Sequence, residues 1–181
     1  KLPNRTQIKA SEADFTVLDN KTIQYGLAAI KNVGYKAATL VSEYRQSHGN
    51  YDSIFDLLRI NNQTINKKTL ESLILVGACS SLGNHRAELY NSMETILKFS
   101  AKFYKDKNTN QVDLFVNSDS DNIQFPSLDS ADPWSVEKEL KYEKELLGFY
   151  LSETPLTKYE SDFKELSSID SNGYNKLNHE K

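Results

Sequence analysis

The spacing of apolar residues changes along the chain, and each change indicates a new element. Residues 14–18 and 23–26 have the composition of two short strands, separated by a polar turn at 19–21. From residue 27 the apolar positions follow a helical period, first over 27–30 and then over about 35–46. The pattern therefore predicts a small N-terminal β-hairpin that leads directly into helices.

The helical pattern then recurs with clear start and stop signals. Residues 53–58 form a short apolar helix, and Asn66 is placed to cap a second one that Gly77 ends. A long helix is predicted from about 84 to 104, and a last one within 133–159. The fold class we expect is mainly α, with helices joined in two helix-turn-helix pairs.

Two stretches lack any period. Residues 105–132 are dominated by Asn, Asp, Ser and Thr, which is typical of an exposed loop, and the pattern fades again after Pro155. No run approaches the roughly 18 apolar residues of a membrane span. With one cysteine, Cys79, and three separated histidines, neither a disulfide nor a zinc site is expected, and we expect a cytoplasmic protein.

Charge divides the chain into two parts. Residues 21–107 carry 12 Lys/Arg and 7 Asp/Glu, a net charge of +5, whereas residues 108–181 carry 7 and 15, a net charge of −8. Clustered positive charge is a common feature of surfaces that bind nucleic acids. Any such contact is therefore expected in the first half of the chain.

Residues 30–38 fit the helix-hairpin-helix pattern of an apolar residue, a turn, a glycine and an alanine four positions later. Asn32 suits a left-handed backbone, and Gly34 allows a sharp turn and a close approach to another surface. Unpaired N–H groups at the start of the second helix can then bind a phosphate oxygen, with Lys31 and Lys36 beside them. The candidate DNA contacts are Lys31, Asn32, Val33, Gly34, Tyr35, Lys36 and Ala37. The alternative is an ordinary tight turn between packed helices.

A more degenerate hairpin follows over residues 73–87. His85 and Arg86 near the start of its second helix are candidate phosphate ligands, although helix capping explains them equally well. We expect this second hairpin to be mainly structural.

The polar loop contains one apolar pair, in the sequence Gln111-Val112-Asp113-Leu114-Phe115. Two exposed large apolar residues either fold back onto the protein or bind another one. The pentapeptide resembles the Q-x-x-L-F peptide by which bacterial proteins bind the sliding clamp. In that mode Leu114 and Phe115 fill a pocket and Gln111 hydrogen-bonds at its rim.

Four separated blocks, at residues 23–34, 55–57, 66–74 and 143–152, together resemble the alpha subunit of bacterial DNA polymerase III, the DnaE-type replicative polymerase. The resemblance covers about residues 13–159 and lies between the fingers and the OB-fold of that family. It implies a clamp-binding domain with tandem helix-hairpin-helix elements and an internal clamp peptide. Asn32 departs from the family by replacing a hairpin glycine.

The resemblance implies a division of the chain into the end of a fingers domain (1–20), the tandem helix-hairpin-helix domain (21–105), a loop with the clamp peptide (106–132), a closing helix (133–159) and a linker toward an OB-fold (160–181). It also implies no catalytic residue, metal or cofactor in this segment, because the family's catalytic aspartates belong to a palm domain. The expected partners are the backbone of double-stranded DNA and the sliding clamp, bound by a monomer and with no membrane. The alternatives are an adaptor whose hairpins only pack, or a DNA-repair protein such as a base-excision glycosylase.

Overall fold

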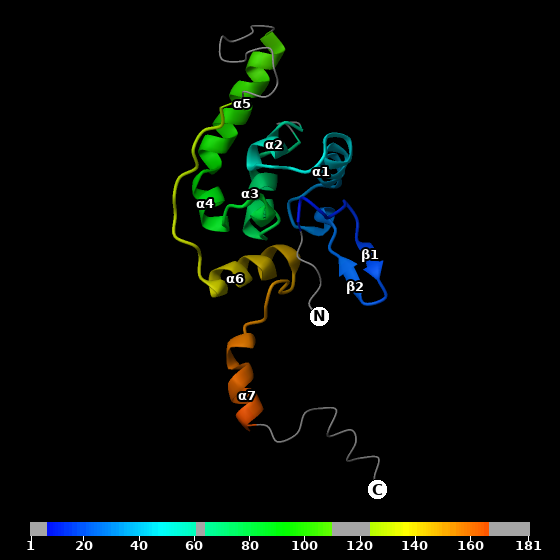
Figure 1. Ribbon diagram of the computed structural model, residues 1–181, viewed down its shortest axis with the longest axis vertical. Helices are drawn as coiled ribbons and strands as arrows, with labels where there is room; N and C mark the ends of the chain where they lie inside the picture. The colour runs from blue at the N-terminus through cyan, green and yellow to red at the C-terminus, as the bar shows by residue number, and fades with distance from the viewer. Residues whose placement is uncertain (1–6, 61–63, 110–123, 167–181) are drawn as a thin grey trace.

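The computed structural model describes residues 7–60, 64–109 and 124–166, with the backbone alone at 105–109 and 164. This part of the chain is mainly helical, as predicted, with one two-stranded sheet (Figure 1). The elements are β1 (Thr16–Asp19), β2 (Thr22–Gln24), α1 (Tyr35–His48), α2 (Ile54–Leu58), α3 (Lys67–Leu75), α4 (Arg86–Asn91), α5 (Met93–Thr109), α6 (Val136–Leu147) and α7 (Glu160–Leu166). Three 3-10 turns join them, η1 (Leu27–Ala29), η2 (Ser80–Leu82) and η3 (Thr157–Tyr159). No helix within the described ranges is long and apolar enough to cross a membrane.

The predicted β-hairpin is confirmed, with its bounds shifted by a residue or two. β1 and β2 are antiparallel, and Val17 lies opposite Ile23 with both side chains exposed. On the other face Gln24 is buried and its amide donates to the Ser11 hydroxyl at 2.9 Å. This buried hydrogen bond therefore attaches the sheet to the segment that precedes β1.

Helix α3 is the centre of the core. Leu70, Leu73 and Ile74 are fully buried, and α4, α5 and α6 all pack against this helix. The predicted signals at its ends are confirmed, because the Asn66 side chain accepts from the Thr69 N–H at 3.0 Å and Gly77 follows with φ at +77°. Figure 1 shows α3 between α1 and α4, with α6 across its lower end.

The single long helix predicted over 84–104 is instead two helices, divided at Ser92. This serine is fully buried and its hydroxyl accepts from the Asp129 N–H at 2.7 Å. Ser92 therefore separates α4 from α5 and also binds the segment around Asp129, which leads from the polar stretch to α6. Phe125 in the same segment stacks on Phe55 with 4.9 Å between ring centroids. The described part of the predicted exposed loop is thus packed on α2 and α5, and α5 itself continues to Thr109.

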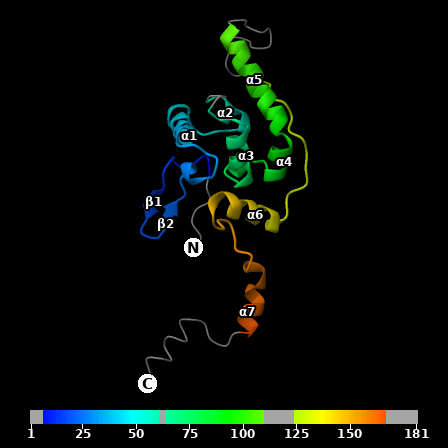
Figure 2. The ribbon, with the colours of Figure 1, turned by 180° about the vertical axis from the view of Figure 1, so that it is seen from behind.

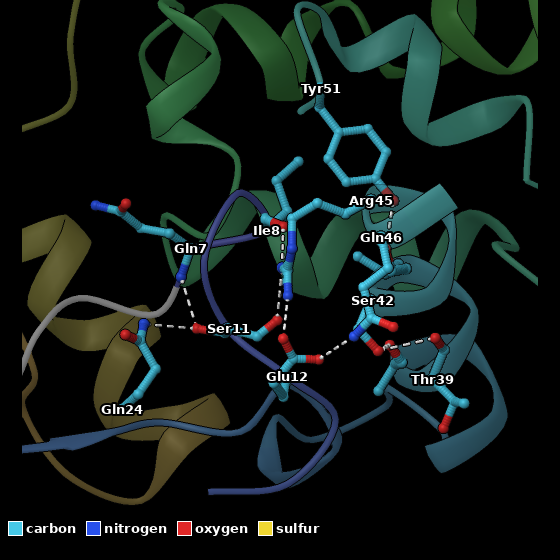
Figure 3. A network of polar contacts seen from close by, with 12 residues as sticks. Gln7, Ile8, Ser11, Glu12, Gln24, Thr39, Ser42, Arg45, Gln46 and Tyr51 are labelled. Carbon is cyan, nitrogen blue, oxygen red and sulfur yellow. Dashed lines mark hydrogen bonds and ion pairs between the residues drawn. The ribbon is translucent and has the colours of Figure 1, made fainter. Parts of the chain in front are cut away.

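The segment before β1 packs against the same core as the helices. Ile8 is fully buried, and its N–H donates to the Ala78 carbonyl at 3.0 Å. Figure 3 shows how Arg45 of α1 holds this segment: the guanidinium donates to the Ile8 and Ser11 carbonyls, each at 2.9 Å, and pairs with Glu12. Residues 7–13 are therefore held against the helices by burial and by hydrogen bonds.

The chain beyond Pro155 is also more ordered than predicted. Residues 160–166, expected in a linker, form α7, which follows η3 and projects away from the other helices in both ribbon views (Figures 1 and 2). Its described side chains are all exposed, so the helix makes little contact with the core.

Candidate nucleic-acid interface

The first hairpin lies between η1 and α1, and Asn32 makes its turn. Asn32 has φ at +68°, the left-handed conformation predicted for it. Its carbonyl accepts from the Thr69 hydroxyl at 3.3 Å, and its side-chain amide donates to the Ser72 hydroxyl at 3.2 Å. Asn32 therefore both forms the left-handed turn and attaches it to α3.

Gly34 has a different role from the one predicted. Its backbone is extended, with φ at −68° and ψ at 150°, so the sharp turn does not depend on it. A β-carbon added there would meet no atom within 4 Å, which means that the space in front of α1 is open. Within the described ranges no side chain caps α1, and no acidic residue occupies its first turn. The first N–H groups of this helix are therefore available to an outside acceptor, and the helix dipole favours an anion there.

Four lysines lie around this helix start. Lys31 and Lys36, both predicted, are exposed on the hairpin and on α1. Lys67 and Lys68 are exposed at the start of α3, next to the Thr69 that bonds the hairpin. Among the described residues no ion pair joins any of the four to an acidic side chain. Sequence reasoning missed Lys67 and Lys68, although they follow the recognised Asn66 cap.

The remaining predicted residues of this hairpin divide into buried and exposed ones. Val33 and Ala37 are buried, so they attach the hairpin to the core and can offer an outside ligand only their backbone. Tyr35 is exposed, and its hydroxyl donates to the Asp14 carboxylate at 2.7 Å. This hydrogen bond and the charge of Asp14 raise the pKa of Tyr35. A negative charge therefore stands beside the start of α1.

The second hairpin places its candidate residues differently. His85 caps α4, since its Nδ1 accepts from the Glu88 N–H at 3.3 Å. Arg86 is buried, and its guanidinium donates to the Leu75 carbonyl at 3.1 Å and to Glu143 at 2.8 Å. The guanidinium donors of Arg86 are thus directed inward to these partners, whereas the sequence suggested an outside phosphate for them. Glu139 lies 3.6 Å from the same guanidinium and lines the hollow beside His85, which makes this turn a poor place for an anion.

Glu143 is the buried partner of Arg86. Besides the guanidinium, its carboxylate accepts from the Leu151 and Ser152 N–H groups at 2.8 and 2.9 Å, and from the Ser152 hydroxyl. Burial alone would raise the pKa of Glu143, but the hydrogen bonds from Ser152, Arg86 and Leu151 outweigh it and hold the pKa below its usual range. The carboxylate is therefore charged at neutral pH and fully partnered.

Three further candidates remain from the sequence: the cysteine, a metal site and the clamp-binding peptide. Cys79 is fully buried, and burial raises the pKa of its thiol to about 12, as expected for a packing residue. No group of His, Cys, Asp and Glu in the described ranges could hold a metal ion. The peptide Gln111–Phe115 lies outside the described residues.

The geometry defines a helix-hairpin-helix protein, and the comparison with family models agrees: the helix-hairpin-helix motif matches residues 4–89. The chain is similar to DNA polymerase III subunit alpha from several bacteria. Its identity is 32% to the subunit of Xylella fastidiosa, 37% to that of Thermus aquaticus and 36% to that of Escherichia coli. These alignments cover 93%, 84% and 80% of the present chain, respectively. It is therefore homologous to one segment of the DNA polymerase III alpha subunit. It spans 12 to 14% of the length of these relatives.

Proposed function

We propose that this chain is a non-catalytic module of a replicative DNA polymerase that holds the backbone of duplex DNA without regard to sequence. The observation that carries the proposal is the uncapped start of α1, open in front of Gly34 and surrounded by exposed lysines. The homologous proteins are named DNA polymerase III subunit alpha, which supports a role within a DNA polymerase.

In the proposed mode, N–H groups at the start of α1 bind one phosphate oxygen, and the lysines contact neighbouring phosphates. Lys31 and Lys36 flank the helix start, while Lys67 and Lys68 enlarge the positive surface from α3. Phosphates are alike at every base step, so such contacts position the duplex but read no sequence. Each neutralised phosphate releases counterions, and binding should therefore weaken steeply as salt is added.

The experiment is a titration of a short fluorescent duplex with the chain at several salt concentrations. Replacing Lys31 and Lys36 by alanine should weaken binding and reduce the slope of log affinity against log salt by about 0.9 for each lysine that contacts a phosphate. The matched control is Lys98→Ala, since Lys98 is an exposed lysine on the more distant α5. Equal slopes of log affinity against log salt for the native chain and the double variant would contradict the proposal. No binding by the native chain would favour the adaptor alternative, in which hairpins only pack.

The second part of the proposal is that Gln111 to Phe115 tether the polymerase to its sliding clamp, with the fragment acting as a monomer in the cytoplasm. The resemblance of this peptide to the clamp-binding pattern supports it. Leu114→Ala together with Phe115→Ala should abolish binding to a cognate clamp in surface plasmon resonance and leave DNA binding unchanged. Undiminished clamp binding by that variant would place the contact elsewhere.

A further inference from the structure

Helix α6 contacts the first hairpin through its backbone. The Leu146 carbonyl, in the last turn of α6, accepts from the Lys31 N–H at 3.0 Å. Lys31 immediately precedes Asn32, so this bond lies at the turn that leads to the start of α1. A shift of α6 along its axis would therefore move the hydrogen-bond acceptor of Lys31 and with it the turn at Asn32.

One turn earlier, α6 is fixed to the second hairpin by a buried ion pair. The Glu143 carboxylate accepts from Arg86 at 2.8 Å, and the same guanidinium donates to the Leu75 carbonyl at the end of α3. Arg86 also lies against Gly77, where an added β-carbon would come within 2.6 to 2.8 Å of three guanidinium atoms. The guanidinium thus fills the space between the second hairpin and α6.

The hydrogen bonds at Glu143 are directional. Its carboxylate has partners on two segments: Arg86 at the start of α4 and, after α6, the N–H groups of Leu151 and Ser152. Apolar contacts allow a helix to slide or rotate a little, whereas several hydrogen bonds to one buried carboxylate permit one arrangement. A buried ion pair is weak evidence for a gain in stability, because an apolar pair of similar volume is often as stable. The measurable consequence of the Arg86–Glu143 ion pair is therefore the position of α6, not a gain in stability.

We propose that Arg86 and Glu143 are positioning residues for the DNA-contacting hairpin: by fixing α6 they hold the Leu146 carbonyl against the Lys31 N–H and so orient the start of α1 for a phosphate. This inference rests on the proposed function of the first hairpin. The second hairpin, whose Arg86 is directed inward to Glu143, acts as the support of the first.

The test replaces the pair by apolar residues of similar volume, Arg86→Met with Glu143→Leu, in the 181-residue chain. Circular dichroism and thermal unfolding establish that the variant folds, and hydrogen exchange then reports on the Lys31 amide. The internal reference is the Ile8 amide, which donates to the Ala78 carbonyl without involving α6. The control variant, Glu94→Leu with Lys98→Met, removes an ion pair whose side chains are both exposed.

We expect the Lys31 amide of the folded variant to exchange faster relative to Ile8 and duplex affinity to fall about tenfold, while the control variant keeps both. A folded variant with native affinity, or with native protection of Lys31, overturns the inference. If the double variant does not fold, Glu143→Gln, which keeps the shape of the side chain, is judged by the same two measurements. A native chain that binds no duplex refutes the proposed function, and exchange at Lys31 still decides whether the pair positions the hairpin.

Discussion

The two hairpins of this chain share one motif and present it differently. In the first, the helix start is uncapped, the space before it is open, and the flanking lysines are exposed. In the second, His85 caps the helix and Arg86 is directed into the core toward Glu143. The backbone pattern alone therefore does not determine a binding role. The capping residue and the direction of the flanking cation decide it.

The largest effect on this comparison should come from removing one member of the buried pair. Glu143→Ala leaves the buried Arg86 guanidinium with the Leu75 carbonyl and the partly exposed Glu139 but without its close charged partner, so the free energy of unfolding should fall by about 3 to 5 kcal/mol. Urea unfolding measures it. Glu94→Ala, which breaks the exposed pair with Lys98, should cost less than about 1 kcal/mol. Similar losses for the two variants would show that the second hairpin does not depend on its inward cation.

A second pair of variants compares one glycine from each hairpin. Gly77→Ala puts a β-carbon on a residue with φ at +77° and against the Arg86 guanidinium, so it should cost about 3 kcal/mol of stability. Gly34→Ala meets no atom within 4 Å on an extended backbone and should change stability by less than about 1 kcal/mol. The methyl group of the Gly34→Ala variant would instead occupy the open space at the start of α1, where the duplex is proposed to bind. Thermal unfolding and duplex titration of both variants separate the two effects, and a reversed order of stability would contradict them.

A third prediction concerns the turn residue of the first hairpin. Asn32→Ala must hold φ at +68° without the asparagine amide, and should cost about 2 kcal/mol. Asn32→Gly adopts that conformation without strain but still loses the hydrogen bond to Ser72, and should cost about 1 kcal/mol. Urea unfolding of the two variants isolates the backbone contribution. If glycine were as costly as alanine, the left-handed turn would not be the reason for asparagine here.

Local signals in the sequence were sufficient for the features that depend on near neighbours. The period of apolar residues predicted the helices up to α6, apart from the division between α4 and α5. The Asn66 cap was confirmed, and Asn32 adopts the predicted left-handed conformation. The inward direction of Arg86 was not predictable in this way, because Glu143 lies 57 positions along the chain. The approach of Lys67 and Lys68 to the first hairpin likewise depends on a contact between Asn32 and Thr69, 37 positions apart. The burial of Ile8 and the division of the long helix at Ser92 also arise from long-range partners.

The smallest predicted effect concerns Asp14, an acidic side chain beside the first hairpin. Asp14 accepts from the Tyr35 hydroxyl at 2.7 Å, and its charge opposes an anion approaching the start of α1. Asp14→Asn keeps the shape of the side chain and removes the charge, so duplex affinity at low salt should rise about two- to threefold. The gain should vanish as salt is added, since the interaction is exposed and therefore screened. Asp52→Asn, an exposed substitution before α2, is the control and should leave affinity unchanged. A gain of equal size from both variants would indicate a general effect of net charge, whereas a gain from Asp14 alone would place the phosphate at the first hairpin.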